Sequence, residues 1–264
     1  GLNAIFMLEL IGDKLPDAQK NEEQKTFENL LLQKNELFFK DDFSKSWTIN
    51  WFLDGQKAQL KNTKAGLLFK AGEVPANDAD HAVLWTKQSF EGDVRIEFDF
   101  TKKDSATKFV NIIYLFAEGS GVGAYEKDIS KWNNLRTVPA MKNYFEHMNA
   151  YHISFAAFEN DNTIRSEDYV RARRYLPERG KGLVGTELTP DYLRTGMFAP
   201  GFKHHVIIIK KGNDIFMQVK NADKEKLFHW SVADFPALNS GRIGLRLMGS
   251  RISEFGNFKV YKLQ

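Results

Sequence analysis

The stretch Val94-Arg95-Ile96-Glu97-Phe98-Asp99-Phe100 decides the fold class, because apolar and charged side chains alternate along it. Successive side chains of a β-strand point to opposite faces, so this period of two predicts a strand with one buried face. A second signal lies in Lys203–Val219, where two apolar runs flank the turn Lys211-Gly212-Asn213-Asp214 and predict a β-hairpin. Shorter apolar runs predict further strands at 46–54, 58–70, 82–90, 109–117, 151–158, 169–176, 224–230, 241–248 and 253–263. We therefore predict an all-β protein, an antiparallel sandwich or jelly roll.

The length of the chain and its lack of linkers predict one main domain. The chain has 264 residues, and all-β sandwiches of roughly 200–250 residues often form a single domain. We predict a sandwich domain over 35–264, preceded by an N-terminal extension over 1–34 with a short helix within Pro16–Lys34. Two irregular stretches, 118–150 and 177–202, are longer than about 15 residues, and loops of that length in compact domains are often functional.

Composition argues against several classes of protein. The 37 basic and 34 acidic residues give a net charge of +3 that is spread along the chain, so we expect no nucleic-acid partner. The chain has no cysteine, which excludes disulfides, thiolate catalysis and cysteine-bound metals. No apolar run approaches the roughly 20 residues of a membrane span.

Five segments carry a likeness to a known family. They are Tyr151-His152-Ile153-Ser154-Phe155, Asp168-Tyr169-Val170-Arg171-Ala172-Arg173-Arg174-Tyr175, Gly185-Thr186-Glu187-Leu188, His81-Ala82-Val83-Leu84-Trp85 and Gly241-Arg242-Ile243-Gly244-Leu245-Arg246. Through them the chain resembles, over roughly residues 36–264, the YesU-like family of uncharacterised bacterial proteins. The resemblance implies a concanavalin A-like lectin/glucanase jelly roll of two antiparallel sheets and a role in polysaccharide breakdown. It implies no catalytic residues.

The location expected for such a protein is outside the cytoplasm. The chain opens with Gly1 rather than Met, so we expect that a signal peptide has been removed. We therefore expect a periplasmic or secreted protein.

The segment Tyr169–Tyr175 offers a candidate site. On a strand, Tyr169, Arg171, Arg173 and Tyr175 share one face. Guanidinium groups can bind a sugar carboxylate with two hydrogen bonds, and tyrosine rings can stack on sugar rings, so this face suits acidic sugars. The alternative is an exposed face on which the arginines pair with nearby acids such as Glu167 and Asp168.

A histidine and several aromatic side chains extend this candidate site. His152 shares a strand face with Ser154 and could act as a general base or orient a substrate, although a lone histidine is more often structural. Arg246 is a further candidate for substrate binding. Sugar platforms are expected among the aromatic residues Trp85, Trp132, Tyr125 and Tyr144, with burial in the core as the alternative for Trp85.

Catalysis by hydrolysis would need two carboxyl groups in one groove. The candidates are Glu118, Asp161, Glu187 and Glu97. Glu97-Phe98-Asp99 resembles part of the Glu-x-Asp-x-x-Glu signature of laminarinase-type glycosidases, but Lys102 occupies the position of the second glutamate. A solvated Arg95–Glu97 pair is the favoured interpretation. No spacing of residues indicates a metal site, although a structural calcium ion is compatible with this type of sandwich.

These patterns predict a carbohydrate-active protein, with a glycoside hydrolase acting on an acidic plant or algal-type polysaccharide as the first hypothesis. The alternatives are a non-catalytic carbohydrate-binding module or lectin, and a polysaccharide lyase that acts on uronic acids. The expected catalytic residues are His152, Tyr169, Arg171, Glu118 and Glu187. The expected substrate-binding residues are Arg173, Tyr175, Trp132, Arg246 and Trp85. We expect a carbohydrate ligand and no cofactor.

Overall fold

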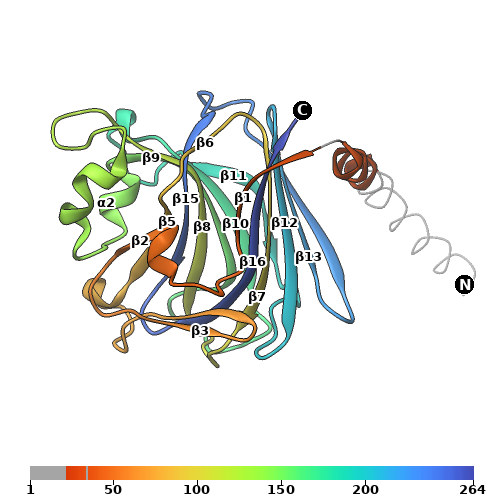
Figure 1. The fold of residues 1–264 in the computed structure, drawn as a ribbon, viewed down its shortest axis with the longest axis horizontal. Coiled ribbons are helices and arrows are strands. Elements are labelled where there is room, and N and C mark those ends of the chain that lie inside the picture. The colour runs from red at the N-terminus through yellow and green to blue at the C-terminus, as the bar shows by residue number, and fades with distance from the viewer. Residues whose placement is uncertain (1–21, 34) are drawn as a thin grey trace, which may run out of the picture.

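The computed structural model describes residues 22–33 and 35–264, and it confirms the predicted all-β sandwich. Two antiparallel sheets of eight strands face each other (Figure 1). The first sheet runs in the order β14 (Glu225–Ser231), β13 (Asp214–Lys220), β12 (Lys203–Lys211), β7 (Val94–Lys102), β16 (Ile252–Leu263), β4 (Gly66–Lys70) and β3 (Gln59–Thr63), with β1 (Asn35–Asp41) paired to β16. The second runs in the order β11 (Glu187–Leu193), β10 (Tyr169–Tyr175), β9 (Met148–Phe158), β8 (Phe109–Gly119), β15 (Ser240–Leu247), β5 (Ala82–Thr86) and β2 (Trp51–Asp54), with β6 (Phe90–Glu91) paired to β15.

Short helical turns occupy parts of the connections. They are η1 (Trp47–Ile49), η2 (Asp78–Asp80), η3 (Ile129–Arg136), α2 (Lys142–Phe145) and η4 (Pro177–Arg179). The 118–150 stretch therefore contains two of these turns, η3 and α2. The 177–202 stretch, expected to be irregular, also supplies β11, whose residues pair with β10. This strand escaped prediction because Pro190 and Asp191 interrupt its apolar pattern.

The strand predictions agree with the sheets in most places. The 94–100 alternation is confirmed, since Ile96, Phe98 and Phe100 are fully buried between the sheets. The hairpin is also confirmed, because β12 and β13 pair up to Lys211 and Asp214. The single strand expected at 58–70 is two strands, β3 and β4, that pair with each other.

Phenylalanine is the most frequent residue in the core between the sheets. Phe155 of β9 meets Phe100 and Phe98 of β7 across the sandwich, with ring centroids 5.0 and 6.3 Å apart. Fully burying one such ring stabilises a fold by roughly 1.5–3 kcal/mol. Burial of these aromatic rings stabilises the sandwich, which has no disulfides.

The outer face of each sheet is covered by a different segment. The 22–32 helix packs on the first sheet, where Phe27 and Leu30 contact Ile207, Ile209 and Phe216. The predicted helix began at Pro16, and residues 16–21 and 34 lie outside the described part of the chain. The segment with η3 and α2 packs on the second sheet, on the far side of the molecule from the 22–32 helix (Figure 1).

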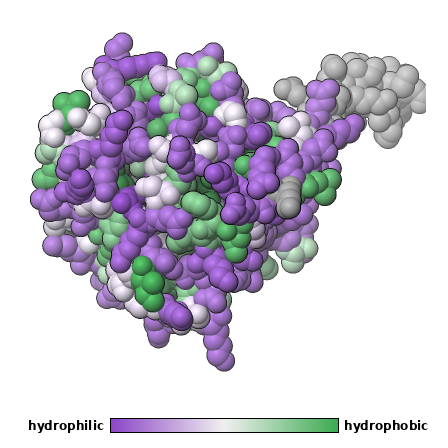
Figure 2. Space-filling view, turned by 45° about the horizontal axis from the view of Figure 1, so that its top comes forward, coloured by the Kyte–Doolittle hydropathy of each residue, from purple (hydrophilic) through white to green (hydrophobic). Residues whose placement is uncertain are grey.

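Hydrophobic residues on the surface occur in separate patches. On the face in Figure 2, hydrophilic residues surround smaller hydrophobic areas. None of the helices among the described residues is long and apolar enough to cross a membrane.

We expect Phe27→Ala to lower the free energy of unfolding by about 3 kcal/mol, because Phe27 is fully buried and its ring lies 5.9 Å from that of Phe216. The matched control is Leu32→Ala, since Leu32 is 84% exposed on the same helix and its removal should change stability by less than about 0.5 kcal/mol. Urea denaturation of both variants measures the difference. Equal stabilities would show that the helix does not dock on the sheet.

Candidate functional site

The outer face of the second sheet brings together most of the predicted polar residues. On β9, Ile153 and Phe155 point into the core, so His152 and Ser154 point outward. The register of the neighbouring strand places Arg173 opposite His152 and Arg171 opposite Ser154. This agrees with the face predicted from the sequence.

His152 is held by two hydrogen bonds in a buried position. Its Nδ1 lies 2.7 Å from the Tyr175 hydroxyl and its Nε2 lies 2.6 Å from the Ser154 hydroxyl. Burial, and then the positive charges of nearby arginines with Arg173 first, hold the pKa of His152 well below its usual range. Burial raises the pKa of Tyr175 well above its usual range. A neutral imidazole and a protonated phenol are therefore in direct contact.

Arg171 and Arg173 are the partly accessible cations of this face, with side chains 21% and 18% exposed. Arg171 donates to Asp191 and Glu159, each at 3.0 Å. Arg173 donates to the Thr186 hydroxyl at 3.0 Å and to Glu187 at 3.3 Å. The partner acids are exposed, and ion pairs of exposed groups contribute little to stability.

The sequence also allowed that the arginines pair with nearby acids, and they do, but Glu167 and Asp168 are not the partners. Glu167 pairs with Arg194, and Asp168 accepts hydrogen bonds from Thr195 and Gly196. The acids that bind Arg171 and Arg173 are instead Asp191, Glu159 and Glu187.

Tyr169 lies beside Arg171, whose guanidinium carbon is 4.1 Å from the centre of the tyrosine ring. Burial raises the pKa of Tyr169 to about 12, so its hydroxyl is protonated at neutral pH. The ring supports the arginine and exposes little surface of its own.

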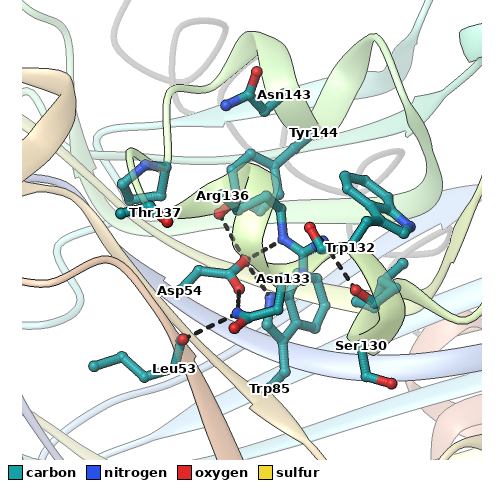
Figure 3. Close-up of polar contacts among 12 residues, drawn as sticks. Leu53, Asp54, Trp85, Ser130, Trp132, Asn133, Arg136, Thr137, Asn143 and Tyr144 are labelled. Atoms are coloured by element: carbon teal, nitrogen blue, oxygen red, sulfur yellow. Dashed lines mark hydrogen bonds and ion pairs between the residues drawn. The ribbon is translucent and has the colours of Figure 1, made fainter. Parts of the chain in front are cut away.

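The buried carboxylate of Asp54, at the end of β2, fixes the segment that covers the other half of this face (Figure 3). It accepts hydrogen bonds from Arg136 at 2.6 Å, from Tyr144 and Trp85 at 2.8 Å, and from Asn133 at 2.6 Å. We call this cluster the Asp54 cluster. No sequence signal pointed to Asp54, because its partners lie 31 to 90 residues away in the chain.

The expectation of sugar platforms at Trp85 and Trp132 is not met, because both rings are buried. Trp85 stacks on Tyr114 at 5.4 Å and lies against Gly244, where a Cβ atom would come within 2.5 Å of the indole. Trp132 donates to the Glu126 carbonyl at 2.9 Å. The polar neighbours Lys131 and Asn134 are exposed and Asn133 binds Asp54, whereas the Trp132 ring faces inward.

Tyr125 and Tyr144 complete the four aromatic candidates. Tyr144 is fully buried between the covering segment and the sheet, where its ring stacks on that of Tyr114 at 5.7 Å. Tyr125 is partly buried, and its ring stacks on His147 at 3.6 Å. Burial therefore removes Tyr144 as a sugar platform, and His147 covers one face of the Tyr125 ring.

Arg246 of β15 also belongs to this face but lies beneath the covering segment. It is fully buried and donates to the Pro139 carbonyl at 2.7 Å. Its guanidinium carbon lies 4.7 Å from the centre of the Tyr144 ring. Burial, and then the positive charge of Arg246, lower the pKa of the neighbouring His81 to about 4.

The expected pair of catalytic acids is not brought together. Glu187 is bound to Arg173 on the outer face, whereas Glu118 accepts a hydrogen bond from Ser240 at 2.6 Å and lines a hollow of about 430 Å³ with Arg174. Arg173 and Arg174 are consecutive on β10 and point to opposite faces. Glu118 and Glu187 therefore lie on opposite sides of the sheet.

The other two candidate acids lie elsewhere. Glu97 is on the first sheet, where Arg95 donates to it at 2.8 Å. The pair favoured from the sequence is therefore present, but it is not solvated, because Glu97 is buried. Asp161 lies with Glu159 and Glu167 in a hollow at the end of β9 and β10. In residues 22–33 and 35–264, no group of three or more His, Asp or Glu side chains is placed to hold a metal ion.

Comparison with known proteins defines the fold. No described protein family and no curated protein matches the sequence. A Bacillus subtilis protein of unknown function with a galectin-like fold matches in structure with a TM-score of 0.62 and 16% identity, over 88% of this chain and 100% of that one. The Ca²⁺/Man3GlcNAc-bound exoplasmic/lumenal domain of VIP36 matches with a TM-score of 0.56 and 13% identity, over 87% of this chain and 91% of that one. Lectin I-B4 from Griffonia simplicifolia matches with a TM-score of 0.53 and 10% identity, over 86% of this chain and 100% of that one.

The fold is that of the lectin-type β-sandwich. At these identities the likeness concerns the fold, and membership of the YesU-like family stays a prediction. The lectin-type fold agrees with the jelly roll predicted for the chain.

We expect part of the stability to be lost as the pH falls from 6.5 to 4, because His81 binds a proton in the unfolded chain near pH 6.5 and in the folded chain only near pH 4. The stabilisation is complete above pH 6.5, and its loss amounts to about 3 kcal/mol for this one group. His81→Asn keeps an acceptor for the Gly249 amide, which His81 Nδ1 accepts at 2.9 Å, and should reduce the pH dependence. Urea denaturation at pH 7 and pH 4 measures it, and an unchanged pH dependence would contradict the assignment.

Proposed function

We propose that this chain binds an acidic glycan on the outer face of the second sheet. The observation that carries the proposal is the pair Arg171 and Arg173, two partly exposed guanidinium groups on adjacent outward positions of β10. The neighbouring side chains His152 and Ser154 add neutral hydrogen-bonding groups. A guanidinium binds a carboxylate with two parallel hydrogen bonds, which favours sugars that carry carboxyl groups.

The exposed acids that hold the arginines do not argue against this function. Glu159, Asp191 and Glu187 are exposed, so they can turn into solvent when a ligand carboxylate takes their place. The exchange of one ion pair for another keeps both guanidinium groups paired. Acids that orient the arginines in the free protein also reduce the cost of ordering them on binding.

The structural neighbours support a sugar ligand by analogy alone. One is a lectin, and another was solved with a bound Man3GlcNAc. A polysaccharide ligand is met outside the cell or in the periplasm, so we also propose a periplasmic or secreted location. Hydrolysis, the first hypothesis from the sequence, is less well supported, because Glu118 and Glu187 lie on opposite sides of the sheet and cannot flank one glycosidic bond.

The experiment for binding is calorimetry with polygalacturonate, alginate and a neutral galactan. We expect binding to an acidic polymer only, and Arg173→Gln should weaken it by about tenfold, because one charge-assisted hydrogen-bonding group is lost. Arg194→Gln is the control, since Arg194 is an exposed arginine that pairs with Glu167 away from His152. Equal binding of acidic and neutral polymers, or no effect of Arg173→Gln, would refute the proposal.

A second candidate function, uronate lyase, is favoured by the contact between His152 and Tyr175. In such an elimination, neutral His152 would take the proton from C5 of the uronate while Arg173 binds the carboxylate. The C4–O bond breaks, a C4=C5 double bond forms, and the Tyr175 hydroxyl gives its proton to the leaving oxygen. The hydrogen bond between the two side chains then returns the proton from His152 to Tyr175. Since His152 is 5% exposed and Tyr175 is fully buried, the substrate reaches them only after the covering segment shifts.

If the chain is a lyase, the same polymers will yield the ultraviolet absorbance of unsaturated uronates together with new reducing ends. Tyr175→Phe should abolish the absorbance and leave the affinity for the polymer nearly unchanged. New reducing ends without absorbance would indicate hydrolysis instead. Binding without either product would leave the binding function alone.

A further inference from the structure

Arg246 differs from the other fully buried arginines in having no carboxylate partner. Arg136 bonds to Asp54 at 2.6 Å, and Arg251 bonds to Asp104 at 2.9 Å. Among the described residues, no Asp or Glu oxygen lies within 4.0 Å of the Arg246 guanidinium nitrogens. A buried charge without a counter-charge is unfavourable, so this position needs an explanation.

The titratable groups around Arg246 do not supply a negative charge. The pKa of His81 is lowered to about 4 by burial, and burial also lowers that of His152, so both rings are neutral. Burial raises the pKa values of Tyr114 and Tyr144, so both phenols keep their protons. The carboxylate of Asp54 accepts a hydrogen bond from Tyr144 but is already paired with Arg136. The guanidinium of Arg246 is thus a positive charge without a carboxylate partner of its own.

The hydrogen bonds of Arg246 are made to uncharged acceptors. Its Nη2 donates to the Pro139 carbonyl at 2.7 Å, and its Nε lies 3.3 Å from the Met248 sulfur. Its Nη1 is buried without a hydrogen-bond partner among the described residues, as is one guanidinium nitrogen of Arg136 and one of Arg251. A carboxylate would bind these donors more strongly than a carbonyl or a thioether, because its hydrogen bonds are charge-assisted.

A line of polar side chains leads from the accessible arginines to Arg246. His152 bonds to Tyr175, and the Tyr175 hydroxyl lies 3.4 Å from that of Tyr114. Arg173 and Arg246 both lower the pKa of His152, so both cations are close to this ring. The outer and inner arginines therefore adjoin one network of buried polar side chains.

The inner end is covered by the turn at Pro139–Met141, in which Pro139 and Ala140 are buried. The Met141 sulfur lies 3.9 Å from the Tyr114 hydroxyl, and Met141 is only partly buried, while the neighbouring Val138 is exposed. Methionine side chains are flexible and repack easily. The Asp54 cluster holds Arg136 and Tyr144 on either side, so the turn between them can shift without detaching the whole segment.

We propose that Arg246 anchors an inner anion subsite, which receives a carboxylate of the glycan when the turn at Pro139–Met141 moves aside. The inference rests on the proposed function, since Arg171 and Arg173 provide the outer part of the same site. It adds that the ligand carries carboxylates on more than one sugar, one for the outer arginines and one for Arg246. A trimer of galacturonate is a suitable probe.

The test compares Arg246→Met with Arg136→Met in thermal stability and in calorimetric affinity for trigalacturonate. An arginine kept for ligand binding should be replaceable by an apolar side chain of similar length, so Arg246→Met should leave the Tm unchanged or raise it. Its affinity for the trimer should fall by about tenfold to a hundredfold. Arg136→Met leaves Asp54 unpaired and should lower the Tm by about 10 °C.

A second variant guards against a general disturbance of the fold. Arg246→Lys keeps the charge but loses the two-pronged geometry, so it should bind the trimer between the wild type and Arg246→Met. If Arg246→Met binds the trimer as well as the wild type, or loses stability as Arg136→Met does, Arg246 is structural and the inference is wrong. If the wild type binds neither trigalacturonate nor any acidic polymer, the proposed function itself fails.

Discussion

The buried carboxylate of Asp54 joins parts of the chain that are far apart in sequence, and the layout of the outer face depends on it. It ends β2 and binds Trp85 of β5, Arg136 of η3 and Tyr144 of α2. Four donors satisfy one carboxylate, so the charge is tolerated in the interior. The contact fixes the covering segment over β5, β8 and β15. It thereby divides the face into a covered half and a half where Arg171 and Arg173 of β10 are partly accessible.

The two faces of the second sheet differ in character, one apolar and one polar, because successive side chains along each strand point to opposite faces. Inward residues such as Ile153 and Phe155 build the core with the first sheet. Outward residues such as His152 and Arg173 form a polar layer, and this layer includes the buried positive charge of Arg246. Core packing and the proposed glycan binding thus use alternate residues of the same strands, so a change in one set need not disturb the other.

Much of the fold could be predicted from the sequence, whereas the candidate site could be predicted only in part. Local periodicity was sufficient for β7, for the hairpin of β12 and β13, and for the shared face of Arg171 and Arg173. Contacts between distant segments produce no local pattern in the sequence. The hydrogen bond between Asp54 and Tyr144, for example, joins residues 90 positions apart. Trp132 misled for a related reason, since its sequence neighbours are polar while its ring packs against the sheet.

The strict pairing of β10 with β9 has a consequence for how such proteins can vary. Arg173 and Arg174 are consecutive, and one faces outward while the other lies beside Tyr151 on the inner side. An insertion or deletion of one residue within β10 would exchange these faces and place a charge in the core. The connections on either side of the strand carry no such constraint. Natural variants should therefore keep the length of β10 and acquire new ligand preferences by lengthening, shortening or replacing the loops around it.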